Sequence, residues 1–117
     1  MKLVPIITAA MLITLILVAG CSQTNYSGFA SCLGEKNATF YGAFWCPHCQ
    51  NQKALFGKAA GLLPYVECST PDGRGQLPTC GTQGIQSYPT WIFSDGTRLT
   101  GEIPLQTLAS KTGCELP

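Results

Sequence analysis

Two cysteines separated by two residues, in the run Cys46-Pro47-His48-Cys49, are the side chains of this sequence best suited to chemistry. They follow an aromatic, strand-like run at 39–44 and precede a helical pattern. Pro47 suits the first turn of a helix, which places Cys46 at the helix N-terminus. Unpaired backbone N–H groups and the helix dipole stabilise a thiolate there, and His48 adds a hydrogen bond or a positive charge. The pair is therefore predicted to be redox-active, with Cys46 as the reactive sulfur and Cys49 as its resolving partner.

The same cysteines also permit a second interpretation, as half of a zinc site. Cys68, Cys80 or His48 would then complete a tetrahedral set of ligands. A structural zinc site usually repeats the two-cysteine motif or adds a pair of histidines, and this chain has one histidine. The redox pair is the better interpretation, and we expect neither a metal nor a cofactor.

The N-terminal residues predict export. The segment from Leu3 to Ala19 is almost entirely apolar and follows Lys2, which is the layout of a secretory signal. Val18-Ala19-Gly20-Cys21 resembles the lipobox of bacterial lipoproteins, in which the cysteine is lipidated and anchors the mature protein to a membrane. The alternative is an uncleaved anchor helix, for which the apolar stretch is short. The predicted organisation is a signal peptide at 1–20, a tether at 21–27 and one domain at 28–117.

Composition limits the partners of that domain. The chain has 117 residues, which leaves room for one small domain after the signal. Lys2 is one of seven basic residues, so the remainder carries six basic and six acidic residues and is near neutral. No basic stripe is present, so we expect no nucleic-acid partner.

The cysteine count indicates an oxidising compartment. Of seven cysteines, setting Cys21 aside leaves six, which fits one reactive pair and two structural bridges. The four cysteines outside the reactive pair allow three pairings. A Cys68–Cys80 bridge would clamp the Gly- and Pro-rich loop, and a Cys32–Cys114 bridge would tie both ends of the domain to its core. These two pairings are predicted.

Hydrophobic patterning and turn residues predict an alternation of helices and strands. A short helix ends at Gly34, and a closing helix is capped by Gly113. The order is helix, strand, helix, strand, loop, strand, strand, helix, with expected ranges 29–33, 39–44, 46–63, 65–68, 69–84 (loop with a helical turn near Gln83), 90–93, 97–100 and 103–112.

This order, with the two-cysteine motif after the first strand and Tyr88-Pro89-Thr90 before the third, resembles the thioredoxin superfamily over residues 26–117. The resemblance implies an α/β, thioredoxin-like fold, in which a central four-stranded sheet is flanked by helices, with an extra N-terminal helix. It also implies that Pro89 is cis and faces the cysteines, where the preceding backbone can pair with a substrate strand. Trp45, Tyr88 and Pro89 would border the substrate groove, although Trp45 has core packing as an equal alternative.

Finer resemblances suggest an activity. Pro-His between the cysteines is the dipeptide of the DsbA-like disulfide oxidases. The run 41–53, with Phe56-Gly57 and 65–68, looks like the thioredoxin-like domain attached to, or partnered with, prokaryotic homologues of vitamin K epoxide reductase. That resemblance implies exchange with exported cysteine-containing proteins and reoxidation by a quinone-linked membrane partner. The sequence departs from many thioredoxins at Phe40, where they carry a buried acid.

Three classes of function therefore compete. The favoured one is an extracytoplasmic, membrane-anchored oxidant of exported proteins. The second is a membrane-tethered reductase or isomerase on the same fold, and the third is a metal-binding or metal-delivery module. The dipeptide between the cysteines separates the first class from the second, because a stabilised thiolate makes the disulfide a stronger oxidant.

Overall fold

The computed structural model describes residue 20 and residues 22–117. Cys21 and, apart from Gly20, the predicted signal peptide lie outside the described residues, so the lipobox stays a prediction. Within the described part, no helix combines the length and the apolar character that a membrane span needs.

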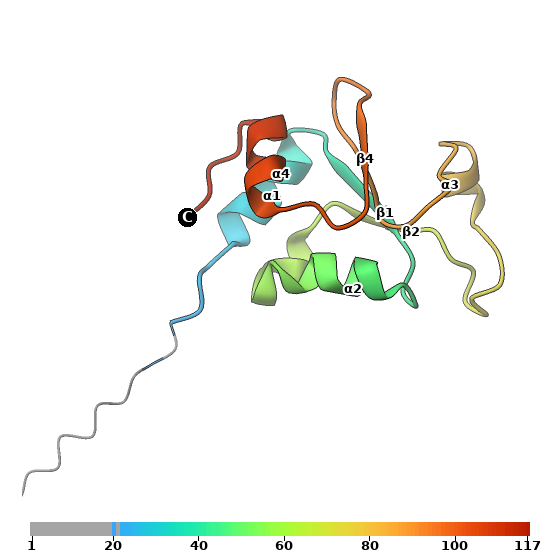
Figure 1. Cartoon of the computed structure of the whole chain (residues 1–117), viewed down its shortest axis with the longest axis horizontal. Helices are drawn as coiled ribbons and strands as arrows, with labels where there is room; N and C mark the ends of the chain where they lie inside the picture. The colour runs from blue at the N-terminus through green and yellow to red at the C-terminus, as the bar shows by residue number, and fades with distance from the viewer. Residues whose placement is uncertain (1–19, 21) are drawn as a thin grey trace, which may run out of the picture.

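The described chain alternates short helices and strands in a mixed α/β arrangement (Figure 1). Within residues 22–117 the elements are α1 (Ser27–Glu35), β1 (Thr39–Gly42), α2 (Pro47–Ala54), the 3₁₀ helix η1 (Gly57–Leu62), β2 (Tyr65–Glu67), α3 (Pro78–Gly81), β3 (Thr90–Ile92), β4 (Arg98–Thr100) and α4 (Leu105–Thr112).

The four strands form one open sheet in the order β2-β1-β3-β4. Strand β1 pairs parallel with β2 and antiparallel with β3, and β3 pairs antiparallel with β4. At the centre, Phe40 lies opposite both Tyr65 and Trp91. A parallel pair needs a crossover, and here α2 and η1 supply it between β1 and β2. The fold is thioredoxin-like, as the resemblance implied.

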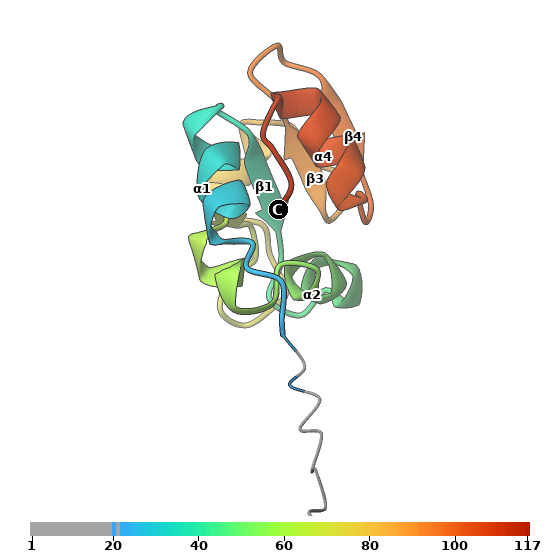
Figure 2. The ribbon, with the colours of Figure 1, turned by 90° about the vertical axis from the view of Figure 1, so that its left-hand side faces the viewer.

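One face of the sheet carries most of the hydrophobic core. Helices α1, α2 and α4 lie over this face, which is turned toward the viewer in Figure 2. The rings of Phe40 and Trp91 stack with centroids 4.9 Å apart, and both side chains are fully buried. The largest other fully buried side chains on this face are Phe56, Leu33 and Leu108.

The opposite face is covered mainly by the segment that follows β2, including α3. Side chains alternate across a strand, so Tyr41 and Ile92 point to this face while their neighbours Phe40 and Trp91 point to the other. The cluster is small and is built around a disulfide rather than around large apolar side chains. Its buried members are Cys68, Cys80 and Ile85.

Two disulfides close this small domain. One joins Cys68 to Cys80, twelve positions apart. The other joins Cys32 in α1 to Cys114 just after α4, across 82 positions. These are the two pairings that the sequence favours. In the chain-entropy description, the longer loop stabilises the folded state by about 4–5 kcal/mol and the shorter by about 3 kcal/mol.

Apart from shifts of one or two residues at the ends of elements, the local structure differs from the sequence prediction at three places. The single helix expected at 46–63 is wrong, because α2 ends at Ala54 and Gly57 adopts a left-handed φ of 53° before η1 begins. Helix α1 continues through Gly34 to Glu35, and the left-handed position after it is Asn37, with φ 58°. The helical turn expected near Gln83 lies earlier, as α3, where a proline occupies its first turn.

A buried glutamine ties α2 to the rest of the core. The Gln52 side chain is fully buried. Its Nε2 donates to the Ile103 carbonyl oxygen at 3.0 Å. Its Oε1 accepts from the Ile103 backbone N–H at 2.6 Å and from Trp91 Nε1 at 3.3 Å. Gln52 thus holds α2 against β3 and against the segment that leads into α4.

Replacement of Gln52 by methionine should destabilise the protein strongly. The variant keeps the side-chain volume but leaves Ile103 and Trp91 with buried, unpaired polar groups, so we expect the free energy of unfolding to fall by about 2–5 kcal/mol. Denaturant unfolding of the oxidised protein measures this, with Gln106→Met on the exposed face of α4 as the matched control. Equal stability of the two variants would contradict the assignment.

Candidate active site

The two-cysteine motif opens helix α2 at the carboxyl end of β1. Cys46 is the N-cap residue, with extended backbone (φ −80°, ψ 117°), and Pro47 occupies the first helical turn. The Cys49 backbone N–H donates to Cys46 Sγ at 3.3 Å. Such a cap satisfies an N–H group that the helix itself leaves unpaired, and it brings the partial positive charge of that N–H group against the sulfur.

The two sulfurs differ in their surroundings. Both cysteines are thiols in this structure, and Cys49 is completely buried whereas Cys46 keeps a small exposed fraction of 5%. Burial first, and then the hydrogen bond with the Cys46 side chain, raise the pKa of Cys49 to about 12. At neutral pH Cys49 is therefore a neutral thiol, and Cys46 is the sulfur that a substrate can reach.

The loop before β3 faces Cys46. The Tyr88–Pro89 peptide bond is cis. The Cys46 thiol donates to the Tyr88 carbonyl oxygen, with the sulfur 3.7 Å away. The structure thus brings together Cys46, Cys49, Tyr88 and Pro89 from two segments about forty residues apart, as the resemblance implied.

Aromatic side chains form a wall beside the reactive sulfur. Trp45 is 48% exposed, which is far from a core position. Its Nε1 donates to Ser69 Oγ at 2.9 Å, and its ring meets the edge of the Tyr88 ring with centroids 5.9 Å apart. Phe44 is equally exposed at 49%. The sequence predicts Phe44 as the last residue of a strand at 39–44, and an aromatic residue there gives no signal of an exposed side chain, whereas β1 ends at Gly42.

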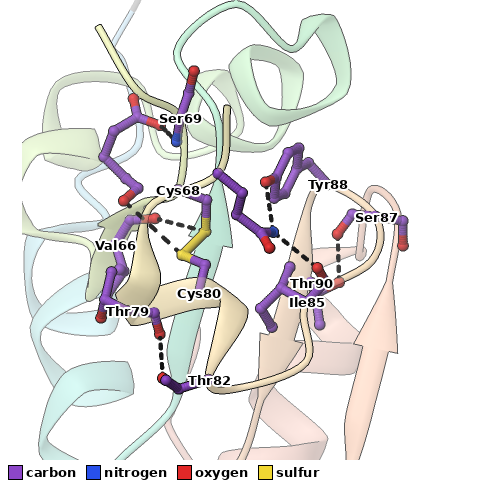
Figure 3. The surroundings of a disulfide bond; sticks show 12 residues. Val66, Cys68, Ser69, Thr79, Cys80, Thr82, Ile85, Ser87, Tyr88 and Thr90 are labelled. Atoms are coloured by element: carbon purple, nitrogen blue, oxygen red, sulfur yellow. Dashed lines mark hydrogen bonds between the residues drawn. A yellow bond between two sulfur atoms is a disulfide. The ribbon is translucent and has the colours of Figure 1, made fainter. Parts of the chain in front are cut away.

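The disulfide-clamped loop holds this wall in place. Gln76 Nε2 donates both to the Tyr88 hydroxyl and to the Ile85 carbonyl oxygen, each at 2.8 Å. Figure 3 shows Tyr88 and Ile85 beside the Cys68–Cys80 bridge. The bridge therefore supports Tyr88 beside Cys46 as well as the second core cluster.

His48 and a carboxylate form a solvent-exposed pair at the opening of the site. His48 Nδ1 lies 3.6 Å from Glu102 Oε1, and the His48 side chain is 69% exposed. At such exposure the pair contributes little to stability. Glu102 follows β4, and no local sequence pattern connects it to His48.

The chemistry of the donors does not favour the zinc alternative. Cys68 and Cys80, two of its proposed further ligands, have their sulfurs bonded to each other. Among the residues that the structure describes, no three His, Cys, Asp or Glu side chains gather as a metal site would need.

Comparison with known proteins identifies a relative of named activity. No protein-family model matches the chain. The chain is 47% identical over 104 residues to the Arabidopsis thaliana protein named thiol-disulfide oxidoreductase LTO1. The match covers 85% of this chain but 27% of the relative, so the chain spans about a quarter of that protein's length. The relative's name agrees with a site built on one slightly accessible thiol and one fully buried thiol.

Native alkylation should distinguish the two thiols. At pH 7 we expect iodoacetamide to label the reduced protein at Cys46 and to leave Cys49 unmodified, because Cys49 is buried and its pKa of about 12 keeps it protonated. Labelling of Cys49 should grow as the pH rises toward that value. Mass-spectrometric peptide mapping measures both, and denaturation with the disulfides intact should expose both thiols. Equal labelling of the native cysteines at pH 7 would refute this view of the site.

Proposed function

We propose that this chain is an extracytoplasmic thiol-disulfide oxidoreductase that donates its Cys46–Cys49 disulfide to exported proteins. The observation that carries the proposal is the arrangement around Cys46, which caps helix α2, faces the Tyr88 carbonyl and leaves Cys49 buried behind it. The name of the Arabidopsis relative supports the reaction class.

The proposed reaction begins with the oxidised pair. A substrate thiolate attacks Cys46 Sγ, a substrate–Cys46 bond forms, and Cys49 leaves as a thiolate that takes a proton from solvent. A second substrate thiolate then attacks the substrate sulfur of this mixed disulfide and releases Cys46. The substrate loses two electrons and gains a disulfide, while the protein ends as the dithiol. The small exposure of Cys46 and the burial of Cys49 direct the attack to Cys46.

The local environment supports an oxidant over a reductant. The N–H group of Cys49 and the start of helix α2 stabilise a Cys46 thiolate, which favours the reduced protein and makes its disulfide more oxidising. His48, beside the same helix end, adds to this effect when protonated. At the position where many thioredoxins carry a buried acid, this chain has Phe40, whose apolar ring is fully buried. A reductant would need the proton acceptor that such an acid provides more than an oxidant would. A reductase or isomerase on the same fold remains the competing function.

The partners follow from the sequence resemblance. A membrane protein of the vitamin K epoxide reductase type, linked to quinone, would reoxidise the pair, and lipidated Cys21 would hold the domain at the membrane beside it. Residues 22–26 precede α1 as an irregular and largely exposed segment, which suits a tether between a lipid and the domain.

The reduction potential of the Cys46/Cys49 pair tests the direction of exchange. We expect a reduction potential of about −120 mV, whereas that of a thioredoxin-type reductant is about −270 mV. Equilibration with glutathione buffers measures it. A value close to that of thioredoxin would replace the oxidant with the competing reductase.

Single cysteine variants test the roles within the pair. Cys46→Ser should abolish exchange, and Cys49→Ser should accumulate mixed disulfides with substrate, because the buried thiol that could expel the substrate is missing. Each variant is first converted with glutathione disulfide to its mixed disulfide with glutathione and then mixed with a reduced, cysteine-containing substrate protein, whose thiolate displaces glutathione. Non-reducing gels then measure the substrate–protein mixed disulfide. Trapping through Cys49 in the Cys46→Ser variant would reverse the assignment.

Metabolic labelling tests the anchor. A radiolabelled lipid precursor should mark the wild-type protein and leave Cys21→Ala unlabelled, with Cys49→Ser as the control for loss of a cysteine elsewhere. A purified protein that begins at Met1 and carries no lipid would support the anchor helix instead.

A further inference from the structure

The buried sulfur of Cys49 packs against strands β1 and β2 at a glycine. A Cβ atom built on Gly42 would lie 3.0 Å from Cys49 Sγ and 2.9 Å from Tyr65 Cε2. Both groups therefore occupy the space that a side chain at this last position of β1 would fill. The absence of a side chain brings the Tyr65 ring and the Cys49 sulfur to the same patch of backbone.

A lysine ammonium lies on the Tyr65 ring. Lys53 follows Cys49 by four positions on α2, so the two side chains share one face of the helix. Lys53 Nζ is 3.6 Å from the centroid of the Tyr65 ring, which is the geometry of a cation–π contact. The ring thus holds a positive charge close to the buried sulfur, and this charge lowers the pKa of Cys49 against the larger effect of burial.

The other titratable groups around Cys49 supply no second cation. Cys46 lies at the start of the same helix, and Tyr65 comes from β2. The Tyr65 hydroxyl is buried without a hydrogen-bond partner among the described residues. Burial first, and then the negative charge of Glu67, raise the pKa of Tyr65, so the phenol stays neutral. Lys53 is the one basic side chain whose charge acts on this sulfur, because His48, the residue before Cys49, is 69% exposed.

We propose that Lys53, seated on the Tyr65 ring, is a positioning residue for disulfide exchange and stabilises the Cys49 thiolate that departs when a substrate attacks Cys46. This inference rests on the proposed function and deepens it. Attack on Cys46 breaks the bond to Cys49 and leaves a full negative charge on a sulfur buried away from water. A nearby ammonium lowers the free energy of that thiolate and of the transition state that leads to it, and a better leaving thiolate departs faster.

The charge of Lys53 can be removed while its side-chain stem is kept. In oxidised Lys53→Met we expect reduction by dithiothreitol at pH 7 to be about three- to tenfold slower than in wild type. Lys53→Arg should restore most of the rate, because it keeps a cation that also stacks on an aromatic ring. Lys58→Met, which removes an exposed lysine from η1, is the matched control and should react like wild type.

A second measurement separates this inference from the proposed function. In the Cys46→Ser background, Lys53→Met should slow the alkylation of Cys49 by a similar factor at pH 8 to 9, and Lys58→Met should leave it unchanged. This measurement needs no substrate protein, so it reports on Lys53 even if the pair proves not to oxidise exported proteins. Thermal unfolding of each variant shows whether the fold is intact, and Lys53→Gln replaces Lys53→Met if the latter unfolds. Equal rates for the Lys53 and Lys58 variants, or a Lys53→Arg variant as slow as Lys53→Met, would overturn the inference.

Discussion

The position of helix α2 depends on one buried amide. The Gln52 side chain is fully buried, and both polar atoms of its amide are hydrogen-bonded. Its nitrogen bonds to the Ile103 backbone, and its oxygen bonds to the Ile103 backbone and the Trp91 indole. A buried amide is tolerated only when its polar atoms are paired, so this arrangement permits one placement of the helix against β3. The N-terminus of the same helix carries Cys46, and its sulfur is therefore fixed relative to the loop that ends in Pro89.

The two faces of the sheet are stabilised by different means. Three helices and large aromatic side chains cover one face, whereas the other has a small cluster closed by the Cys68–Cys80 bridge. A covalent bond takes the place of apolar area that a domain of this size cannot supply on both sides. The reactive pair lies on the helix-covered face, where Cys49 can be buried deeply.

Sequence reasoning predicted what is encoded locally. The two-cysteine motif, Pro47 at a helix start and the turn residues are patterns of neighbouring residues, and the order of elements followed from them. The four-stranded sheet was implied by the resemblance that this order carries. It failed where distant segments decide the structure. Gln52 has a polar side chain whose partner lies 51 positions away, and Glu102 reaches His48 across a similar separation. The break between α2 and η1 depends on Gly57, which a helical pattern alone does not distinguish from an interior glycine.

The hydrogen bond from Gln76 to the Tyr88 hydroxyl has a consequence for the maturation of the chain. Gln76 belongs to a loop that is closed covalently between Cys68 and Cys80, so the support for Tyr88 is complete only after that bond has formed. A newly made chain has both of these sulfurs reduced. The support of Tyr88 beside Cys46 would therefore be completed by oxidation, the same kind of reaction that the finished site is proposed to bring about in other proteins. New copies would depend on older ones or on another oxidant.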